Sequence, residues 1–278
     1  MIERWCGGLI YNVKSIHYDN FTTTKLFAKP IIKKEEEKKE NLRKDYKNEE
    51  RTEKEKIHCL EVSLNATKNR LYNIVYSNKW DYFITMTFDQ KGTKTGKPID
   101  SSNYELCLKK LKIFIDNLKK RKCPDLQYII VPELHSDKVH YHFHGLLSNC
   151  EGLILEDSGH KTEDEQIIYN LPQWTYGFTT ATKVKDNDKV SSYLAKYISK
   201  DNFLKIPNKK RYLCSKGLER KEPVYENVYP DVFIEEIKDK IDYCKTRNIP
   251  EAYQQIKYFT LKNKDYDSYQ EQSVCSEA

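Results

Sequence analysis

The sequence has no long hydrophobic run and no closely paired cysteines. No apolar stretch approaches the roughly 18 residues that a membrane span requires. The N-terminal residues include Glu3 and Arg4 where a signal peptide would carry its apolar core. The eight cysteines are scattered without a CxxC pair, which argues against a zinc knuckle or a disulfide framework. We therefore expect no membrane partner, and free thiols in a reducing cytoplasm.

Composition leaves room for a folded core and for a polyanionic partner. Of the 278 residues, 38% are hydrophobic and 12% are aromatic, which is enough bulk to bury. The formal net charge of +6 is a modest surplus that permits a polyanionic ligand without requiring one. Residues 33–56 stand apart, because 19 of these 24 residues are charged with both signs interleaved. Such a segment is predicted to be a solvated helix or a flexible linker.

From residue 57 onward, strand and helix signals alternate. Apolar spacing predicts a helix over 64–77, and Ser102 with Glu105 predicts a capping box that opens a second helix, ended by Cys123 and Pro124. Runs of aromatic and β-branched residues predict strands at 80–88, 127–131, 139–147 and 174–184, before a last helix over 189–200. The tight link between the second and third strands indicates an antiparallel hairpin. This order favours an α+β domain with an antiparallel sheet covered by helices.

The strongest chemical signal is a histidine cluster, because four of the seven histidines fall between His135 and His144. Alternate residues of a strand share a face, so His140, His142 and His144 are expected to point the same way. The last two can hold one metal ion, and a hairpin would bring Glu133 beside them as a third ligand. This donor set suits Mg²⁺ or Mn²⁺. The alternatives are a solvent-facing strand rich in histidine and a carboxylate on a surface turn.

A second signal lies on the predicted helix near residue 195. Tyr193 and Tyr197 are one turn apart, with Lys196 and Lys200 just beyond them. A phenol can be a nucleophile, and a lysine can stabilise charge on a phosphate. A single tyrosine in a sequence with 21 of them is more simply a packing residue.

A basic stretch follows this helix. Residues 196–221 contain nine lysines and arginines against two acidic residues, with aromatic residues interleaved. This combination is typical of grooves for single-stranded nucleic acid, although a solvated basic surface is the simpler alternative. The residues that we expect to contact nucleic acid are Lys200, Lys209, Lys210, Arg211 and His140.

In this order the features resemble the HUH endonucleases, and specifically the rolling-circle replication initiators (Rep proteins) of plasmids and small DNA phages. The strand Phe83–Phe88 is similar to the first motif of that superfamily, and His142-Phe143-His144 to the second. Tyr193 with Lys196 is similar to the third motif, which Tyr197 and Lys200 repeat. The resemblance extends over residues 65–224. Lys138 departs from it, because related sequences often have a turn glycine there.

The resemblance implies the HUH endonuclease fold, an α+β fold with a central five-stranded antiparallel sheet flanked by helices. It places the nickase domain at 57–225. The remaining segments are then an N-terminal extension with the charged linker at 1–56 and a C-terminal tail at 226–278. Amphipathic spacing, from Ile234 to Cys244, predicts that this tail is helical.

The resemblance also implies a reaction. Tyr193 would attack single-stranded or hairpin origin DNA beside a metal held by Glu133, His142 and His144, leaving a 5′-phosphotyrosyl link and a free 3′-OH. Lys196 would stabilise charge on the phosphate, and Tyr197 would serve as a second nucleophile. A host helicase and DNA polymerase would then use the 3′-OH in the cytoplasm of a bacterial cell.

Three other functions fit the same residues. A transposase or relaxase of the superfamily would use the same chemistry on different DNA. A zinc hydrolase would use Glu133 as a general base and form no covalent adduct. A DNA-binding module with a degenerate site would bind DNA without cutting it.

Overall fold

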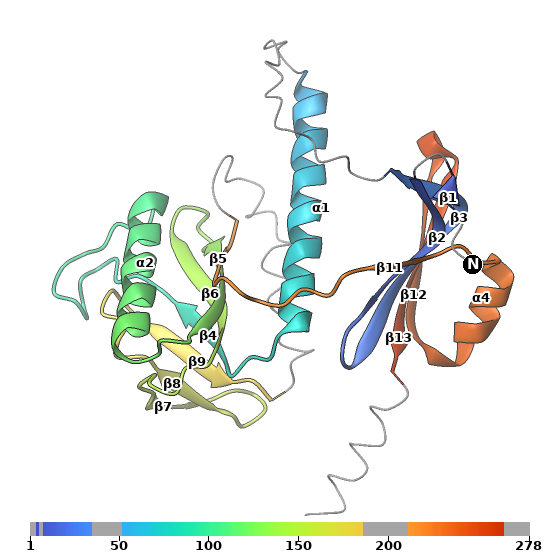
Figure 1. Ribbon diagram of the computed structural model, residues 1–278. Coiled ribbons are helices and arrows are strands. Elements are labelled where there is room, and N and C mark those ends of the chain that lie inside the picture. Colours follow the sequence, from blue (N-terminus) through green and yellow to red (C-terminus); the bar gives the residue numbers. More distant parts are fainter. Residues whose placement is uncertain (1–3, 6–7, 35–51, 186–210, 264–278) are drawn as a thin grey trace, which may run out of the picture. The chain divides into compact units, whose positions relative to one another are not determined.

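The computed structural model describes residues 4–5, 8–34, 52–185 and 211–263 (Figure 1). It is a mixed α+β protein with two antiparallel sheets, which confirms the predicted class. The chain divides into two compact units, which we call the central unit (51–220) and the terminal unit (1–50 with 221–278). Among the described helices, none is long and apolar enough to cross a membrane.

The central unit is built on one antiparallel sheet. In chain order its elements are α1 (Glu53–Ser77), β4 (Tyr82–Met86), α2 (Tyr104–Arg121), β5 (Gln127–Leu134), β6 (Tyr141–Ser148), β7 (Glu156–Lys161), β8 (Ile167–Asn170), β9 (Thr179–Lys183) and β10 (Leu213–Cys214). The strand order is β10-β5-β6-β4-β9-β8-β7, so the described sheet has seven strands where five were expected. The β7–β8 hairpin accounts for two of them and lies where the sequence shows only an acidic loop. Strand β6, which carries the two histidines, is an internal strand.

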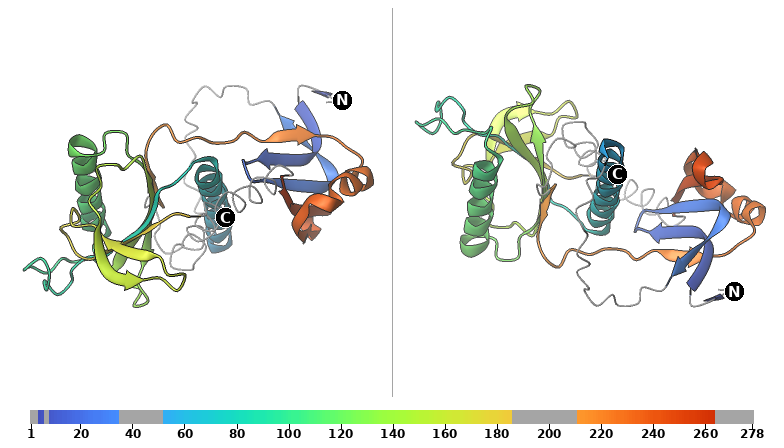
Figure 2. Two further views of the ribbon diagram at one scale, coloured as in Figure 1. Left: turned by 90° about the horizontal axis from the view of Figure 1, so that it is seen from below. Right: turned by 90° about the horizontal axis from the view of Figure 1, so that it is seen from above.

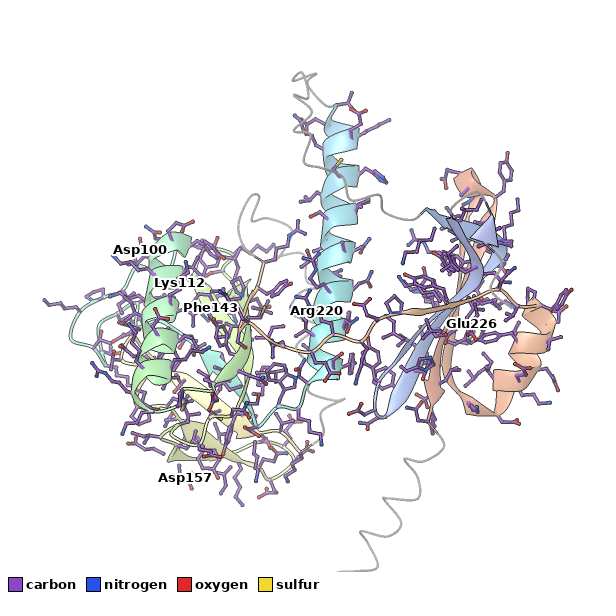
Figure 3. The ribbon with its side chains drawn as sticks, viewed as in Figure 1. Asp100, Lys112, Phe143, Asp157, Arg220 and Glu226 are labelled. Carbon is purple, nitrogen blue, oxygen red and sulfur yellow. The ribbon has the colours of Figure 1, made fainter. Side chains whose placement is uncertain are left out.

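A helix covers each face of this sheet (Figure 2). Helix α2 buries Leu111 and Phe114 against the face of β6 that carries Phe143, whose side chain points toward α2 in Figure 3. Helix α1 buries Leu71 and Ile74 against the opposite face, where Leu146 lies. The sheet is therefore buried on both faces over its central strands, and the two cores together hold β6 in place.

Both helices follow their predicted apolar stripes but differ in where they begin. The buried residues of α1 are Leu64, Leu71, Ile74 and Val75, which are the four residues that the spacing selected. Helix α2 is capped by Asn103, whose side chain accepts a hydrogen bond from the backbone N–H of Leu106. Ser102 instead donates to the carboxylate of Asp100. The capping box predicted at Ser102 is therefore wrong by one residue, because Asn is an equally good N-cap.

The strand predicted over 174–184 is shorter, since only Thr179–Lys183 pairs as β9. The residues before it form a turn that packs against the end of β4. The indole of Trp174 is fully buried and donates a hydrogen bond from Nε1 to the carbonyl oxygen of Thr87. Gly177 lies so close that an added Cβ would be 2.3 Å from that same oxygen and 2.7 Å from the backbone nitrogen of Asp89.

The terminal unit joins the two ends of the chain in a second sheet. Its elements are β1 (Arg4–Trp5), β2 (Gly8–His17), β3 (Phe21–Lys34), β11 (Val224–Glu226), α4 (Pro230–Ile237), β12 (Ile241–Ile249) and β13 (Gln254–Lys262), with short 3-10 turns at Lys238–Lys240 and Pro250–Ala252. The strand order is β1-β2-β3-β13-β12, and β11 also pairs with β2. Helix α4 packs on one face of this sheet, against Val13, Leu26 and Phe259 (Figure 1).

The helical tail expected at the C-terminus is thus only partly helical in the described residues. Ile234 lies in α4, whereas Ile241 and Cys244 lie in strand β12. The backbone of β12 pairs with β13 along its length, and β13 in turn pairs with β3. Sheet pairing with the distant N-terminal strands has overridden the local helical spacing.

Gly177→Ala tests the packing of the 174–178 turn on the end of β4. The added methyl group would overlap backbone atoms that cannot rotate away, so we expect a loss of about 3 kcal/mol in the free energy of unfolding. The matched control is Gly96→Ala, because Gly96 has φ +73° but nothing within 4 Å of the new carbon. That variant should lose about 1 kcal/mol from the left-handed backbone alone. Urea denaturation of both variants measures the difference, and equal losses would contradict the close packing.

Candidate metal centre

Strand register brings the candidate ligands together. In the antiparallel pair β5–β6, Glu133 lies directly opposite His142 and Val131 lies opposite His144. On the other side of β6, Thr85 of β4 lies opposite His144. Because facing residues of paired strands project to the same side, all these side chains lie on the sheet face that α1 covers. The predicted hairpin is therefore confirmed and has the register that the site needs.

The three candidate ligands converge on one point. Oε2 of Glu133 lies 3.1 Å from Nε2 of His142 and 3.0 Å from Nε2 of His144. One ligand atom from each residue lies within 4.8 Å of the others, and the three side chains are buried. Two imidazole nitrogens and a carboxylate oxygen form a donor set that fits a divalent cation, whose charge would offset the cost of burying the carboxylate.

Partners outside the triad orient the two imidazoles differently. Nδ1 of His144 lies 3.0 Å from Oγ1 of Thr85, a contact that turns Nε2 toward Glu133. Nδ1 of His142 is buried without a hydrogen-bond partner among the described residues. Once Nε2 binds a cation, the proton of a neutral imidazole resides on Nδ1. The Thr85 hydroxyl can accept a hydrogen bond from that N–H of His144, so His144 is the better-supported ligand of the pair.

The ring of His135 packs on His142, with the two ring centroids 4.1 Å apart. Burial, and then the neighbouring His142 ring, lower the pKa of His135. His135 is therefore neutral near pH 7 and brings no positive charge to the pocket. The sequence marked His135 as surplus to a three-ligand site and did not single out Thr85. The signal for Thr85 is its place in β4, where alternate residues face the same side as the histidines.

His140 lies apart from the triad. Its Nδ1 is 2.7 Å from Oδ2 of Asp137 on the turn that joins β5 to β6. The hydrogen bond from His140 holds the pKa of Asp137 below its ordinary value. Lys138 in this turn has φ 57°, the left-handed conformation that favours the glycine expected from the resemblance. His140 thus stabilises the turn, and its expected contact with nucleic acid stays a prediction.

Among the remaining predicted residues, the structure describes Arg211. Its Nη1 donates hydrogen bonds of 3.1 Å to Oγ of Ser63 and Oγ1 of Thr67, both on α1. This guanidinium therefore fixes the start of β10 to α1, and DNA binding by Arg211 stays a prediction. The residues that lie outside the described ranges are Tyr193, Lys196, Tyr197, Lys200, Lys209 and Lys210.

Comparison with known proteins bears on the same part of the chain. Residues 81–202 match a family model of replication-associated proteins, the ORF2 group. The match supports a rolling-circle replication initiator family. It confirms the resemblance inferred from the motifs, and the matched segment contains the buried triad and both candidate tyrosines. No curated protein and no solved structure matches the chain. A replication initiator acts on DNA, so DNA is the partner that this family indicates.

Thr85→Val tests whether the triad is a metal site with an oriented imidazole. Valine keeps the shape of threonine but cannot form a hydrogen bond with Nδ1 of His144, so affinity for Mn²⁺ should fall by about 10–100-fold. Isothermal titration of the whole chain with Mn²⁺ measures this. Thr87→Val is the matched control, because the Thr87 hydroxyl donates to the carbonyl of Phe178 and not to a ligand. Its Mn²⁺ affinity should equal that of the wild type, and an equal loss in both variants would exclude a specific role for Thr85.

Proposed function

We propose that this chain is a metal-dependent HUH nickase that initiates rolling-circle replication on single-stranded or hairpin origin DNA. The observation that carries the proposal is the buried triad Glu133, His142 and His144 on internal strands of the sheet, within the segment that matches replication-associated proteins. Neither observation alone selects the reaction. Together they combine a site for a divalent cation with a family whose substrate is DNA.

In this proposal Glu133, His142 and His144 hold Mg²⁺ or Mn²⁺. A bound divalent cation polarises a phosphate oxygen and stabilises the charge that develops during displacement at phosphorus. Thr85 fixes the ring of His144, and His135 shields His142 while remaining neutral. The pocket is buried, so its electrostatic interactions are stronger than they would be in bulk water.

The proposed nucleophile is Tyr193. Its phenolic oxygen forms a bond to the scissile phosphorus while the bond from phosphorus to the 3′ oxygen breaks. The phenol gives up its proton and the 3′ oxygen ends as a hydroxyl, so the products are a 5′-phosphotyrosyl link and a free 3′-OH. Lys196 neutralises charge on the phosphate, and Tyr197 acts in a second strand transfer.

The described residues on either side of this segment support its placement near the metal. Val184, directly after β9, and Tyr212, directly before β10, both pack in the cluster that α1 forms with Ile129 and Leu146. That cluster lies on the same sheet face as the triad. The chain therefore leaves and re-enters the described structure on the face that carries the metal ligands.

The remaining proposed roles concern DNA and its use after nicking. Phosphate contacts are assigned to Lys200, Lys209, Lys210, Arg211 and His140. They would supply affinity that falls as salt rises. A host helicase and DNA polymerase would then extend the 3′-OH in a bacterial cell.

Tyr193→Phe tests the chemistry. Wild-type protein incubated with Mn²⁺ and a single strand labelled internally or at its 3′ end should give an SDS-resistant protein–DNA adduct. Phenylalanine keeps the ring and removes the attacking oxygen, so this variant should give no adduct. Tyr197→Phe is the matched control and should still nick. Mass spectrometry of the trapped peptide identifies the attacking residue.

The outcomes separate the competing functions. An adduct at Tyr197 alone would reverse the order of the two tyrosines. Cleavage by Tyr193→Phe and Tyr197→Phe together, without an adduct, would identify a hydrolase instead. DNA binding with no cleavage under any metal would leave a degenerate binding module. Loss of the adduct in a His142→Ala, His144→Ala double variant that still binds DNA is expected from the metal role, and undiminished nicking by it would refute that role.

A further inference from the structure

The face of the terminal sheet opposite α4 carries a continuous row of lysine and tyrosine side chains. The register places Tyr225 of β11 opposite Lys14 of β2, Lys14 opposite Lys25 of β3, Lys25 opposite Tyr258 of β13, and Tyr258 opposite Lys245 of β12. We call these five residues the Lys–Tyr row. Each of five adjacent strands thus contributes one member. In the strands, their immediate neighbours Val13, Leu26 and Phe259 face α4, so the row faces the other way.

Aromatic and aliphatic side chains pack beside this row on the same face. Tyr11 contacts Tyr225 edge-on at a centroid distance of 4.7 Å and contacts Phe27 at 5.9 Å. Tyr11, Phe27 and Ile256 are buried and form a cluster with the partly buried Tyr225 and Tyr258. The rings of the row are therefore held by packing. On the edge strand, the ring of Tyr243 is 56% exposed and lies one step along the same face.

The two central lysines of the row have no acidic partner within the described part of the chain. Lys14 and Lys25 lie directly opposite each other, and neither forms an ion pair with any residue that the structure describes. Opposed like charges on neighbouring strands are destabilising. Burial, and then the charge of Lys14, lower the pKa of Lys25. An anion bound between the two lysines would relieve this repulsion.

The lysines are arranged around the rings. Nζ of Lys33 lies 4.3 Å and Nζ of Lys14 lies 5.5 Å from the centre of the Tyr225 ring, and Nζ of Lys25 lies 5.4 Å from the centre of the Tyr258 ring. The acidic residues of α4, Asp231, Glu235 and Glu236, belong to the element that packs on the opposite face. The unit therefore has its acidic helix on one side and a cationic, aromatic sheet face on the other.

We propose that the Lys–Tyr row is a second binding surface for single-stranded DNA, separate from the metal centre. Lysines neutralise phosphates, and aromatic rings stack on unpaired bases whatever their sequence. An acidic peptide or an anionic membrane would satisfy the charges but would not use rings spread along a flat sheet. The choice of DNA over RNA rests on the proposed function, whereas the preference for an unpaired strand comes from the surface itself.

Lys14→Gln with Lys25→Gln tests this surface. The whole chain is titrated against a fluorescein-labelled oligo(dT) in EDTA, so that neither metal nor cleavage contributes, and anisotropy gives Kd at several salt concentrations. Removing two phosphate contacts should lower the slope of log K against log salt by about 1.4. At low salt we expect roughly tenfold weaker binding. Tyr243→Leu, which removes an exposed ring, should weaken binding about fivefold or more with the salt slope unchanged.

The matched control is Lys238→Gln with Lys240→Gln, which removes the same charge from the turn after α4. It should bind oligo(dT) like the wild type. Equal loss in the test and control pairs would reduce the effect to net charge, and an unchanged Kd and salt slope in the Lys14, Lys25 variant would refute the surface. Tighter binding of oligo(U), or of phosphatidylserine vesicles with no affinity for oligo(dT), would refute DNA as its ligand.

Nicking is measured separately on the same variants. Loss of oligo(dT) binding with covalent adduct still formed at high DNA concentration would support the surface and leave the nickase intact. Adduct formation with unchanged binding would sink the surface alone. Binding that depends on the Lys–Tyr row in a protein that never forms an adduct would refute the proposed function and keep the surface.

Discussion

The pairing of β5 with β6 is the constraint on which the candidate site depends. A carboxylate and two imidazoles meet only because Glu133 lies opposite His142 and two residues of β6 separate successive side chains on one face. A slip of one residue would turn both imidazoles toward α2 and replace them with Phe143. Gly145 helps to hold the register, since a Cβ there would be 2.7 Å from Cγ1 of Ile130 and 2.9 Å from the carbonyl oxygen of Ile129.

This dependence explains why the sequence predicted the triad so directly. The histidine spacing and the short link to the preceding strand are local features, and a hairpin converts them into contacts without any long-range information. The four buried residues of α1 were predictable for the same reason, because helical period is read from one segment. Thr85 could not be selected in this way. Its contact with His144 exists only because β4, far earlier in the chain, pairs with the other edge of β6.

The errors share a physical cause. Trp174 looks like the start of a strand, but its indole finds a buried acceptor on Thr87 and the chain turns to reach it. The β7–β8 hairpin has no apolar alternation to announce it, since most of its residues are exposed. The terminal sheet is the largest case, because strands near residues 25 and 258 pair across almost the whole chain. Helical spacing around Ile241 and Cys244 was a weaker determinant than that pairing.

The two surfaces have chemical properties that a single surface could not combine. A metal centre needs neutral imidazoles and a nearby carboxylate, so added lysines beside it would compete with the cation and weaken its binding. Affinity for a polyanion needs many cationic contacts spread along the strand. Glu133 accordingly lies in a buried pocket lined by histidines, while Lys14 and Lys25 lie on a different sheet with their charges unpaired among the described residues. In a nickase this separation lets the chemistry act on one phosphate while the strand is held through others. It also means that loss of grip and loss of cleavage are separable defects in this chain.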